Sequence, residues 1–369
     1  MSEPGMQQPV ADLPHTPTPG VGTETQPINF LEYWKAGVRE VTTFRGHNRE
    51  VWCVAFSSDQ RTLASGGCDR LVRMWDIETG RLLRSLRGHT NDIRAVQFTP
   101  DGASLITGSE DRTIRIWNPT TGEPTKLLFA RYDHGVCSIS LSPDGLMLAR
   151  GGHNKDVKIW EVTTGTELMT LLGKDQFDHH WSVCVAFSPD GIHLASGYDI
   201  GKIKLWEVLP NGEEKVFHAG HWREPIDEDD SETRGYFVDD QLAVFQKPME
   251  YWIGAMTFSP DGKVLFTASR DATIKFYHVP ELKEFRTLKG HSEWIRSLAV
   301  SPDGRVLASA SDDQTVKFWD ISSGRHFRTI KGHSDGVRGI AFSPDGLRLA
   351  SGSSDRTVKL WEGGPEPTG

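Results

Sequence analysis

Short runs in which apolar and polar residues alternate fill most of the chain and recur at a regular interval. The first complete set consists of VWCVAF, RTLASG, LVRMWDI and LLRSLRG, at residues 51–56, 61–66, 71–77 and 82–88. An alternation of period two is typical of a β-strand with one buried face. Four such runs joined by short polar turns therefore predict a four-stranded antiparallel meander as the structural unit.

The stretch RTLASGGCDRLVRMWD at 61–76 has six further copies along the chain. Each of the seven copies ends in an aromatic residue: Trp75, Trp117, Trp160, Trp206, Tyr277, Trp319 and Trp361. The last apolar residue of the first strand lies 19 residues before this aromatic in every copy, at Phe56, Phe98, Leu141, Phe187, Phe258, Val300 and Phe342. Because this spacing is constant, we expect no insertion within the first three strands of any repeat.

Length varies between repeats instead. In the regular repeats the histidine of a Gly-His pair lies nine residues before the end of the next first strand, as at His47, His89, His291 and His333. His221 lies 37 residues before Phe258, which places 28 extra residues within 222–250. A second, smaller addition precedes Phe187.

Gly-His, Ser/Thr-x-x-x-Asp and Trp-Asp recur together at a period of about 42 residues, and this pattern resembles the WD-repeat family over residues ~40–362. The resemblance implies an all-β fold, a seven-bladed β-propeller of four-stranded antiparallel blades. The chain ends soon after the third strand of repeat seven, and a strand-like run at 40–44 precedes repeat one. We therefore expect this N-terminal strand to complete the last blade and close the ring.

Three segments follow from this organisation. Residues 1–37 contain six prolines and almost no apolar periodicity, so we expect a disordered arm. The aromatic residues at 30–34 are the exception, and they offer a means of pinning the arm to the folded part. We expect the propeller at 38–362, with the loop 222–250 inserted on its top face, and a short flexible tail at 363–369.

The family's structural tetrad of His, Ser or Thr, Asp and Trp maps onto four repeats. The sets are His47, Ser65, Asp69, Trp75; His89, Thr107, Asp111, Trp117; His291, Ser309, Asp313, Trp319; and His333, Ser351, Asp355, Trp361. Buried indole, hydroxyl and imidazole groups each require a hydrogen-bond partner, which accounts for these residue types. The same types could form a catalytic triad, but a nucleophile must face a cleft, and four copies favour a framework. We therefore expect no catalytic residues and no enzyme.

Blades 3 to 5 depart from the pattern and should be the least regular sector. Arg150 and Asn154 replace the Ser and Asp in blade 3. Asp178 takes the His position in blade 4, and Tyr277 replaces the Trp in blade 5.

The remaining candidates for chemistry are thiols and imidazoles. The four cysteines show no C-x-x-C spacing and are interpreted as reduced. Four histidines could converge at the rim as metal ligands, or could be ordinary surface and framework residues: His153, His179, His180 and His221. We favour the second interpretation and expect no metal and no cofactor.

In the family, the residue four positions before the end of each first strand lines the top of the central channel. The corresponding residues here are Trp52, Arg94, Cys137, Val183, Gly254, Arg296 and Arg338. Three arginines would give half of the mouth a cationic character that suits a carboxylate, a phosphate or an acidic peptide. The alternative is neutralisation by acidic residues close in register: Glu50, Asp92, Glu110, Glu293, Asp312 or Asp335.

Four tryptophans cluster at the starts of first strands, on the face where partners of the family commonly bind: Trp52, Trp181, Trp252 and Trp294. They could anchor a partner, or they could pack beneath the inserted loops. Together with Arg94, Arg296 and Arg338 they form the candidate partner-binding set. We also consider the acidic stretch 224–232 a candidate salt-sensitive lid over this mouth.

These features favour a non-catalytic scaffold that binds a protein or peptide partner on the top face, around the central channel. The arginines would suit an acidic partner. The alternatives are an enzyme or a small-ligand or metal-binding propeller that uses the channel mouth, and a structural or regulatory subunit of a larger assembly that uses the arm.

Composition narrows the setting of the protein. The net charge of −9 disfavours nucleic acid and anionic membrane as partners. No apolar run approaches the ~18 residues of a membrane helix, and the N-terminus lacks the features of a signal peptide. We expect a cytoplasmic protein, monomeric as a propeller within a complex.

Overall fold

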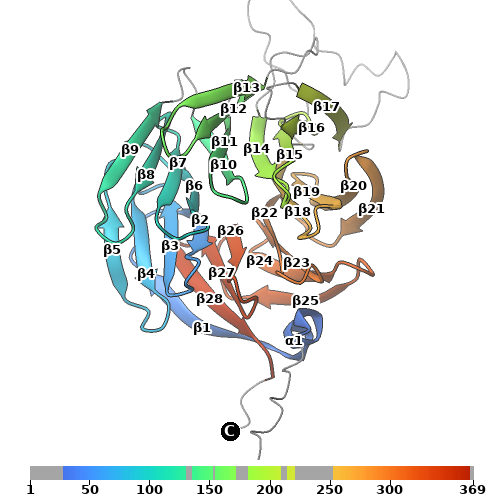
Figure 1. The fold of residues 1–369 in the computed structure, drawn as a ribbon. Coiled ribbons are helices and arrows are strands. Elements are labelled where there is room, and N and C mark those ends of the chain that lie inside the picture. The colour runs from blue at the N-terminus through green and yellow to red at the C-terminus, as the bar shows by residue number, and fades with distance from the viewer. Residues whose placement is uncertain are drawn as a thin grey trace, which may run out of the picture.

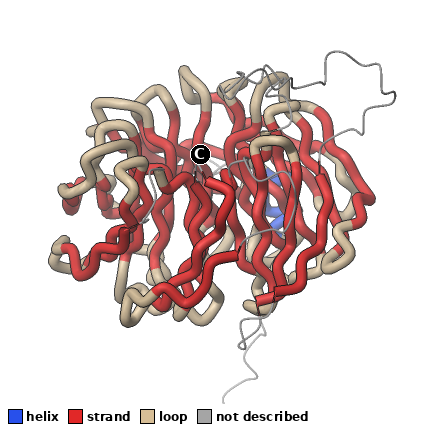
Figure 2. The backbone as a smooth tube through the Cα atoms, turned by 90° about the horizontal axis from the view of Figure 1, so that it is seen from above, coloured by secondary structure: helices blue, strands red, loops and turns tan. Residues whose placement is uncertain are grey.

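The computed structural model describes residues 28–129, 135–152, 154–171, 182–208, 214–220 and 252–365. Seven blades of four antiparallel strands surround a central channel, which confirms the fold expected from the repeats (Figure 1). Seen from the side, the strands run between two faces on which the loops gather (Figure 2).

The strands of the first three blades are as follows. Blade 1 contains β2 (Val51–Phe56), β3 (Thr62–Gly67), β4 (Val72–Asp76) and β5 (Leu82–Leu86). Blade 2 contains β6 (Ile93–Phe98), β7 (Leu105–Ser109), β8 (Thr113–Trp117) and β9 (Pro124–Phe129). Blade 3 contains β10 (Val136–Leu141), β11 (Met147–Gly152), β12 (Asn154–Glu161) and β13 (Glu167–Leu171).

The other four blades repeat the same order. Blade 4 contains β14 (Ser182–Phe187), β15 (His193–Tyr198), β16 (Lys202–Val208) and β17 (Glu214–Gly220). Blade 5 contains β18 (Ile253–Phe258), β19 (Val264–Ser269), β20 (Thr273–His278) and β21 (Lys283–Lys289). Blade 6 contains β22 (Ile295–Val300), β23 (Val306–Ser311), β24 (Thr315–Asp320) and β25 (His326–Lys331). Blade 7 contains β26 (Val337–Phe342), β27 (Arg348–Ser353), β28 (Thr357–Gly363) and β1 (Val38–Arg45).

The N-terminal strand closes the ring as expected. β1 pairs antiparallel with β28, from Val38 opposite Gly363 to Arg45 opposite Thr357. The first strand of each blade lies nearest the channel and the fourth lies at the outside (Figure 1). We call the face with the loops between blades and the turns between second and third strands the upper face.

Apolar packing joins each blade to the one before it. Trp117 of blade 2 packs with Ala64 and Met74 of blade 1. Trp75 of blade 1 packs with Val358 and Leu360 of blade 7, so the same contact bridges the two ends of the chain.

Hydrogen bonds link each of the four tetrads in one order. In blade 7, Trp361 Nε1 donates to Ser351 Oγ at 2.8 Å. Ser351 Oγ lies 2.8 Å from His333 Nε2, and His333 Nδ1 lies 2.8 Å from Asp355 Oδ2. The indole uses an oxygen lone pair of the serine, so the serine hydroxyl donates to Nε2 and the imidazole donates from Nδ1 to the carboxylate.

In the irregular sector, blade 3 has an ion pair where the other blades have the tetrad serine or threonine, and blade 4 keeps the hydrogen bond between its tryptophan and its serine. Arg150, fully buried at the Ser position, forms an ion pair with Asp156, with Nη2 3.5 Å from Oδ1. In blade 4, Trp206 Nε1 donates to Ser196 Oγ at 2.8 Å. Asp178 lies outside the described residues. A single pairing of Gly152 with Ser182 joins the sheets of the two blades.

The structure shortens the expected arm. Residues Phe30–Ala36 form a helix, α1, at the seam between blades 6 and 7, whereas the sequence predicted disorder up to residue 37 (Figure 1). Asn29 caps its first turn, and Arg328 donates to the carbonyls of Trp34 and Lys35 at its end. Residues 1–27 and 366–369 lie outside the described residues.

Trp34 is the anchor that the helix buries. Its ring stacks on Phe318 with centroids 5.0 Å apart, and its Nε1 donates to the Gly346 carbonyl at 3.0 Å. Gly346 has φ +71°, and a Cβ there would lie 2.6 Å from the Phe30 ring, so the turn requires glycine. Burial of one aromatic therefore fixes a helix that is too short to be stable alone.

We expect Trp34→Ala to lower the free energy of unfolding by about 3–5 kcal/mol, the usual cost of truncating a buried tryptophan. Lys35→Ala, at an exposed position of the same helix, should change it by less than about 0.5 kcal/mol. Urea unfolding measures both, and equal stability of the two variants would contradict the anchoring role.

The tetrads also predict how stability depends on pH. Burial lowers the pKa of His47 below 6.5, although Asp69 opposes this shift. The pKa of Asp69 falls from 3.8 to about 2, because hydrogen bonds from His47 and Arg73 outweigh its burial. In both cases the unfolded chain binds protons at a higher pH than the folded chain, so acid destabilises the fold.

We therefore expect the free energy of unfolding to fall from pH 6.5 downward, and to fall more steeply between pH 4 and pH 2. Asp69→Asn should be less stable at pH 7 but should lose less on acidification, whereas the exposed control Glu123→Gln should follow the wild type. Urea titrations at several pH values test this, and an Asp69→Asn curve parallel to the wild type would refute it.

Candidate functional site

A β-bulge near the start of every first strand shapes the upper mouth of the channel. In blade 1, Val51 pairs with Gly67 and Cys53 with Gly66, which leaves Trp52 as the extra residue. The same shift leaves one extra residue in each of the other six blades. Bulges redirect side chains, and here they turn seven residues toward the channel.

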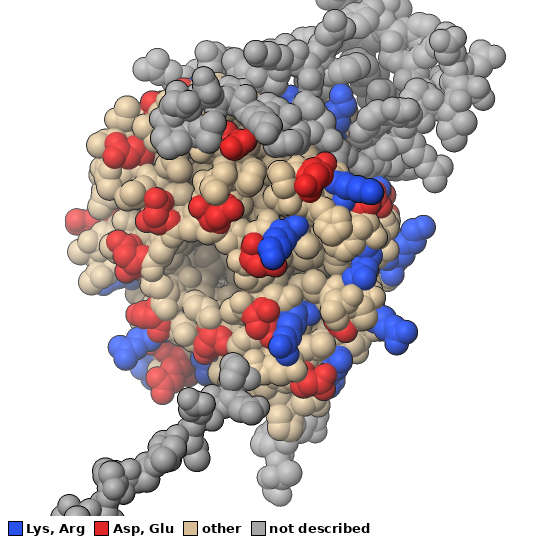
Figure 3. All heavy atoms as spheres, turned by 45° about the vertical axis from the view of Figure 1, so that its right-hand side comes forward, with Lys and Arg blue, Asp and Glu red and all other residues tan. Residues whose placement is uncertain are grey.

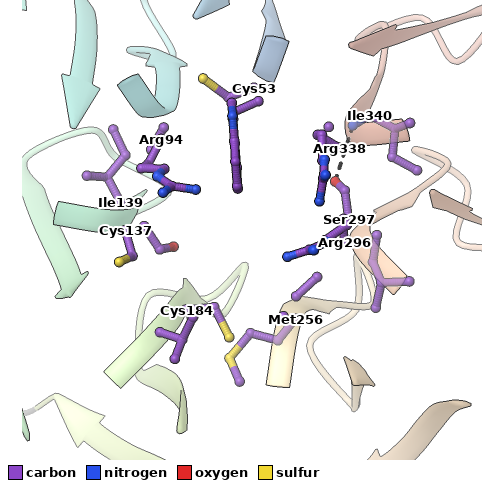
Figure 4. A pocket seen from close by; sticks show the side chains of 18 of the residues that line it. Cys53, Arg94, Cys137, Ile139, Cys184, Met256, Arg296, Ser297, Arg338 and Ile340 are labelled. Carbon is purple, nitrogen blue, oxygen red and sulfur yellow. Dashed lines mark hydrogen bonds between the residues drawn. The ribbon is translucent and has the colours of Figure 1, made fainter. Parts of the chain in front are cut away.

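We call these seven residues the collar: Trp52, Arg94, Cys137, Val183, Gly254, Arg296 and Arg338. They are the positions that the family resemblance assigned to the channel, and all seven line one cavity of about 530 Å³. Figure 4 shows the side chains of Arg94, Arg296 and Arg338 pointing toward its centre. Trp252 and Trp294 line the same cavity, whereas Trp181 and the loop 222–250 lie outside the described residues.

Four collar residues contact the residue 16 positions later, at the turn between the second and third strands. Trp52 Nε1 donates to Cys68 Sγ at 2.7 Å, and Arg338 Nε donates to Ser354 Oγ at 2.8 Å. Arg94 and Arg296 face Glu110 and Asp312 in the same way.

Acidic residues neutralise the arginines in part, which was one of the two interpretations left open above. Arg94 Nε lies 2.9 Å from Glu110 Oε1. Arg296 binds Asp312 through Nε and Nη2, and Arg338 Nη1 lies 2.9 Å from the same carboxylate. Three guanidiniums thus face two carboxylates, which leaves one positive charge in excess.

The tryptophans hold the guanidiniums by cation–π contacts. The guanidinium carbon of Arg94 lies 3.6 Å from the centroid of the Trp52 ring, and that of Arg338 lies 5.1 Å from it. Arg296 stacks on Trp294 at 3.4 Å, and Arg270 lies 5.3 Å from the same ring. Because each of these indoles already contacts two arginines, a cationic ligand is unsuitable for them.

The ion pairs leave donors unused. Within the described part of the chain, the two Nη groups of Arg94 and the Nη2 group of Arg338 have no hydrogen-bond acceptor, because these arginines make their contacts through Arg94 Nε, Arg338 Nε and Arg338 Nη1. The arginine side chains are 16–23% exposed, so they are accessible from the cavity. Burial lowers the pKa of Arg296, and the charges of Arg338 and Arg94 add to this shift against Asp312. An anion at the mouth would relieve that repulsion.

Sequence reasoning missed the contribution of Arg270, Ser354 and Cys68 to this site. The constant spacing of 16 residues between a collar residue and its turn partner is the signal that could have found them.

Comparison with known proteins places the repeats in a family. Seven segments match the family described as "WD domain, G-beta repeat": residues 38–76, 80–118, 125–161, 171–207, 240–278, 282–320 and 324–362. The chain belongs to the WD-repeat family. Six of these WD repeats begin at or near the fourth strand of one blade and end with the third strand of the next, which is how β1 comes to complete blade 7. The fifth match begins at residue 240, after β17.

Curated relatives resemble short parts of the chain. A probable E3 ubiquitin ligase complex SCF subunit sconB of Arthroderma benhamiae is 45% identical over 53 residues, 14% of this chain and 8% of that protein. Eukaryotic translation initiation factor 3 subunit I of Phaeosphaeria nodorum is 38% identical over 45 residues, 12% of this chain and 14% of that protein. The WD repeat-containing protein 3 homolog of Dictyostelium discoideum is 38% identical over 58 residues, 16% of this chain and 6% of that protein.

No described helix has the length and apolar character needed to cross a membrane. No group of three His, Cys, Asp or Glu side chains among the described residues is placed to hold a metal ion. The candidate ligands His153, His179, His180 and His221 lie outside the described residues.

Burial holds all four thiols in the neutral form. It raises the pKa of Cys53, Cys68, Cys137 and Cys184 to about 12 in each case. Since the thiolate is the nucleophile, iodoacetamide at pH 8 should alkylate the native protein at least ~100-fold more slowly than the urea-unfolded protein. Mass spectrometry of modified peptides measures this, and one rapidly modified cysteine would identify an activated thiol.

Proposed function

We propose that this WD-repeat propeller is a non-catalytic scaffold that binds a protein or peptide partner on its upper face, with an acidic group of the partner at the collar. The observation that carries the proposal is the convergence of three partly neutralised arginines on one cavity. Charge-assisted hydrogen bonds from guanidinium to carboxylate or phosphate are among the strongest polar contacts in proteins.

The tryptophans support a macromolecular partner. Trp52, Trp252 and Trp294 are half-buried around the mouth, and tryptophan and arginine are the residues most enriched at energetic centres of interfaces. The net negative charge of the chain does not oppose an acidic partner, because the arginines lie inside the channel. Figure 3 shows mostly Asp and Glu side chains around the hollow at the centre of the ring on the face in view.

A framework role for the tetrads supports the absence of catalysis. Each tetrad serine or threonine already accepts the indole N–H and is fully buried. A nucleophile needs access to a substrate, and these hydroxyls have none.

A role as a subunit of a larger assembly is the second candidate. The names of two relatives describe subunits of multiprotein complexes, an SCF ubiquitin ligase complex and translation initiation factor 3. By this likeness we propose a place in a cytoplasmic complex, which is compatible with the scaffold.

Substituting Arg94, Arg296 and Arg338 together by Gln should abolish partner capture from a lysate, as scored by quantitative mass spectrometry. Glutamine keeps the polar stem without placing a new carboxylate beside Glu110 and Asp312. The matched control replaces Arg61, Arg81 and Arg325, three exposed arginines of lower-face turns, by Gln. Capture that survives in the collar variant, or that fails equally in the control, would contradict the proposal.

A further inference from the structure

A second ring of side chains lies directly below the collar. Two residues further along each first strand, the channel is lined by Val54, Val96, Ile139, Val185, Met256, Leu298 and Ile340. All seven are apolar, whereas the collar above them carries three arginines. Most of these side chains also pack in the cores between blades and present only part of their surface to the channel, and Ser138 and Ser297 line the same cavity. The cavity therefore offers a cationic entrance above a mainly apolar interior.

At blade 5 the entrance presents backbone instead of a collar side chain, and the Trp294 indole packs against it. Gly254 is the only collar residue without a side chain, and a Cβ there would lie 2.6 Å from Trp294 Nε1. The indole N–H thus lies over a backbone that only glycine leaves uncovered. The Arg296 guanidinium stacks on the same indole, so an acceptor group on this side of the mouth would meet Arg296.

We infer that the collar binds the free C-terminal carboxylate of a partner whose last residue is apolar, and that the apolar ring takes its side chain. The inference rests on the proposed function and names the group that is recognised. A closed ring admits a chain end directly, whereas an internal peptide segment would have to loop in and out through the same mouth. An internal Asp or Glu would also leave the apolar ring unused.

The charges at the collar predict which substitutions weaken binding and which strengthen it. Arg94 pairs with Glu110 through Nε, whereas its Nη1 and Nη2 groups have no partner among the described residues and are available to a carboxylate. Asp312 instead competes with a bound carboxylate, because it already pairs with Arg296 and Arg338. Loss of Arg94 and loss of the Asp312 charge should therefore move affinity in opposite directions.

The test uses the full chain and N-acetyl-leucine as the probe, titrated by saturation-transfer NMR. A ligand of this size is expected to bind with Kd of about 1 mM. N-acetyl-leucinamide, which lacks the carboxylate, and N-acetylglycine, which lacks the side chain, should each bind at least tenfold more weakly. Equal binding of the amide would overturn the carboxylate assignment, and equal binding of N-acetylglycine would overturn the role of the apolar ring.

Variants locate the site. Arg94→Gln should weaken N-acetyl-leucine at least tenfold, Asp312→Asn should strengthen it at least threefold, and the exposed control Arg81→Gln should leave it unchanged. Gly254→Ala should weaken it without a change of charge. Thermal unfolding of each variant confirms that it is folded, and a folded Arg94→Gln protein with unchanged affinity would place the binding elsewhere and overturn the inference.

Two further measurements are needed. One distinguishes a fatty acid from a peptide end, and the other distinguishes failure of the terminal-carboxylate inference from failure of the scaffold proposal. Octanoate that binds tighter than N-acetyl-leucine would assign the site to fatty acids instead of peptide ends. If the collar variant loses its partners but N-acetyl-leucine neither binds nor competes with them, the scaffold proposal stands and the terminal-carboxylate inference fails.

Discussion

Closure of the ring is the constraint on which the rest of this molecule depends. A single blade buries its faces only against its neighbours, so the first and last blades must meet. β1 pairs with β28 along its length, and Trp75 packs into blade 7 as Trp117 packs into blade 1. The collar depends on the same seam, since Arg338 of blade 7 lies over Trp52 of blade 1.

The bulges convert this framework into a site. A regular strand would alternate its side chains between the two neighbouring blades, and both faces are needed for packing. One extra residue per first strand escapes that requirement and projects into the channel. The hydrogen bond from the following turn back to the strand, as from Asp312 N to Trp294 O, holds its partner 16 residues later beside it. Packing therefore does not restrict the chemistry of the mouth.

The fold could be predicted from the sequence because its determinants repeat. The constant distance from Phe56 to Trp75 and its six equivalents fixed three strands per blade, and the run at 40–44 indicated the closing strand. Helix α1 could not be predicted, because its seven residues owe their order to the burial of Trp34 against distant blades. The bulges leave no mark in composition, so only the family resemblance placed the collar. The sharing of Asp312 by two arginines is a matter of geometry that spacing alone does not reveal.

Two residues per blade, one in the bulge and one in the turn, set the character of the mouth. Arg94 with Glu110 and Arg296 with Asp312 are balanced pairs, while Arg338 has only the serine hydroxyl of Ser354 as its turn partner and borrows the carboxylate of blade 6. Gly254 with Arg270 adds a cation where the collar has no side chain. Although the chain has a net charge of −9, the excess positive charge of the collar lies at blades 5 to 7 beside Trp52. The repeat that fixes the framework does not fix the residue types at most of these positions, Gly254 being an exception because a Cβ there would meet Trp294, so the character of the mouth can change without altering how the blades pack.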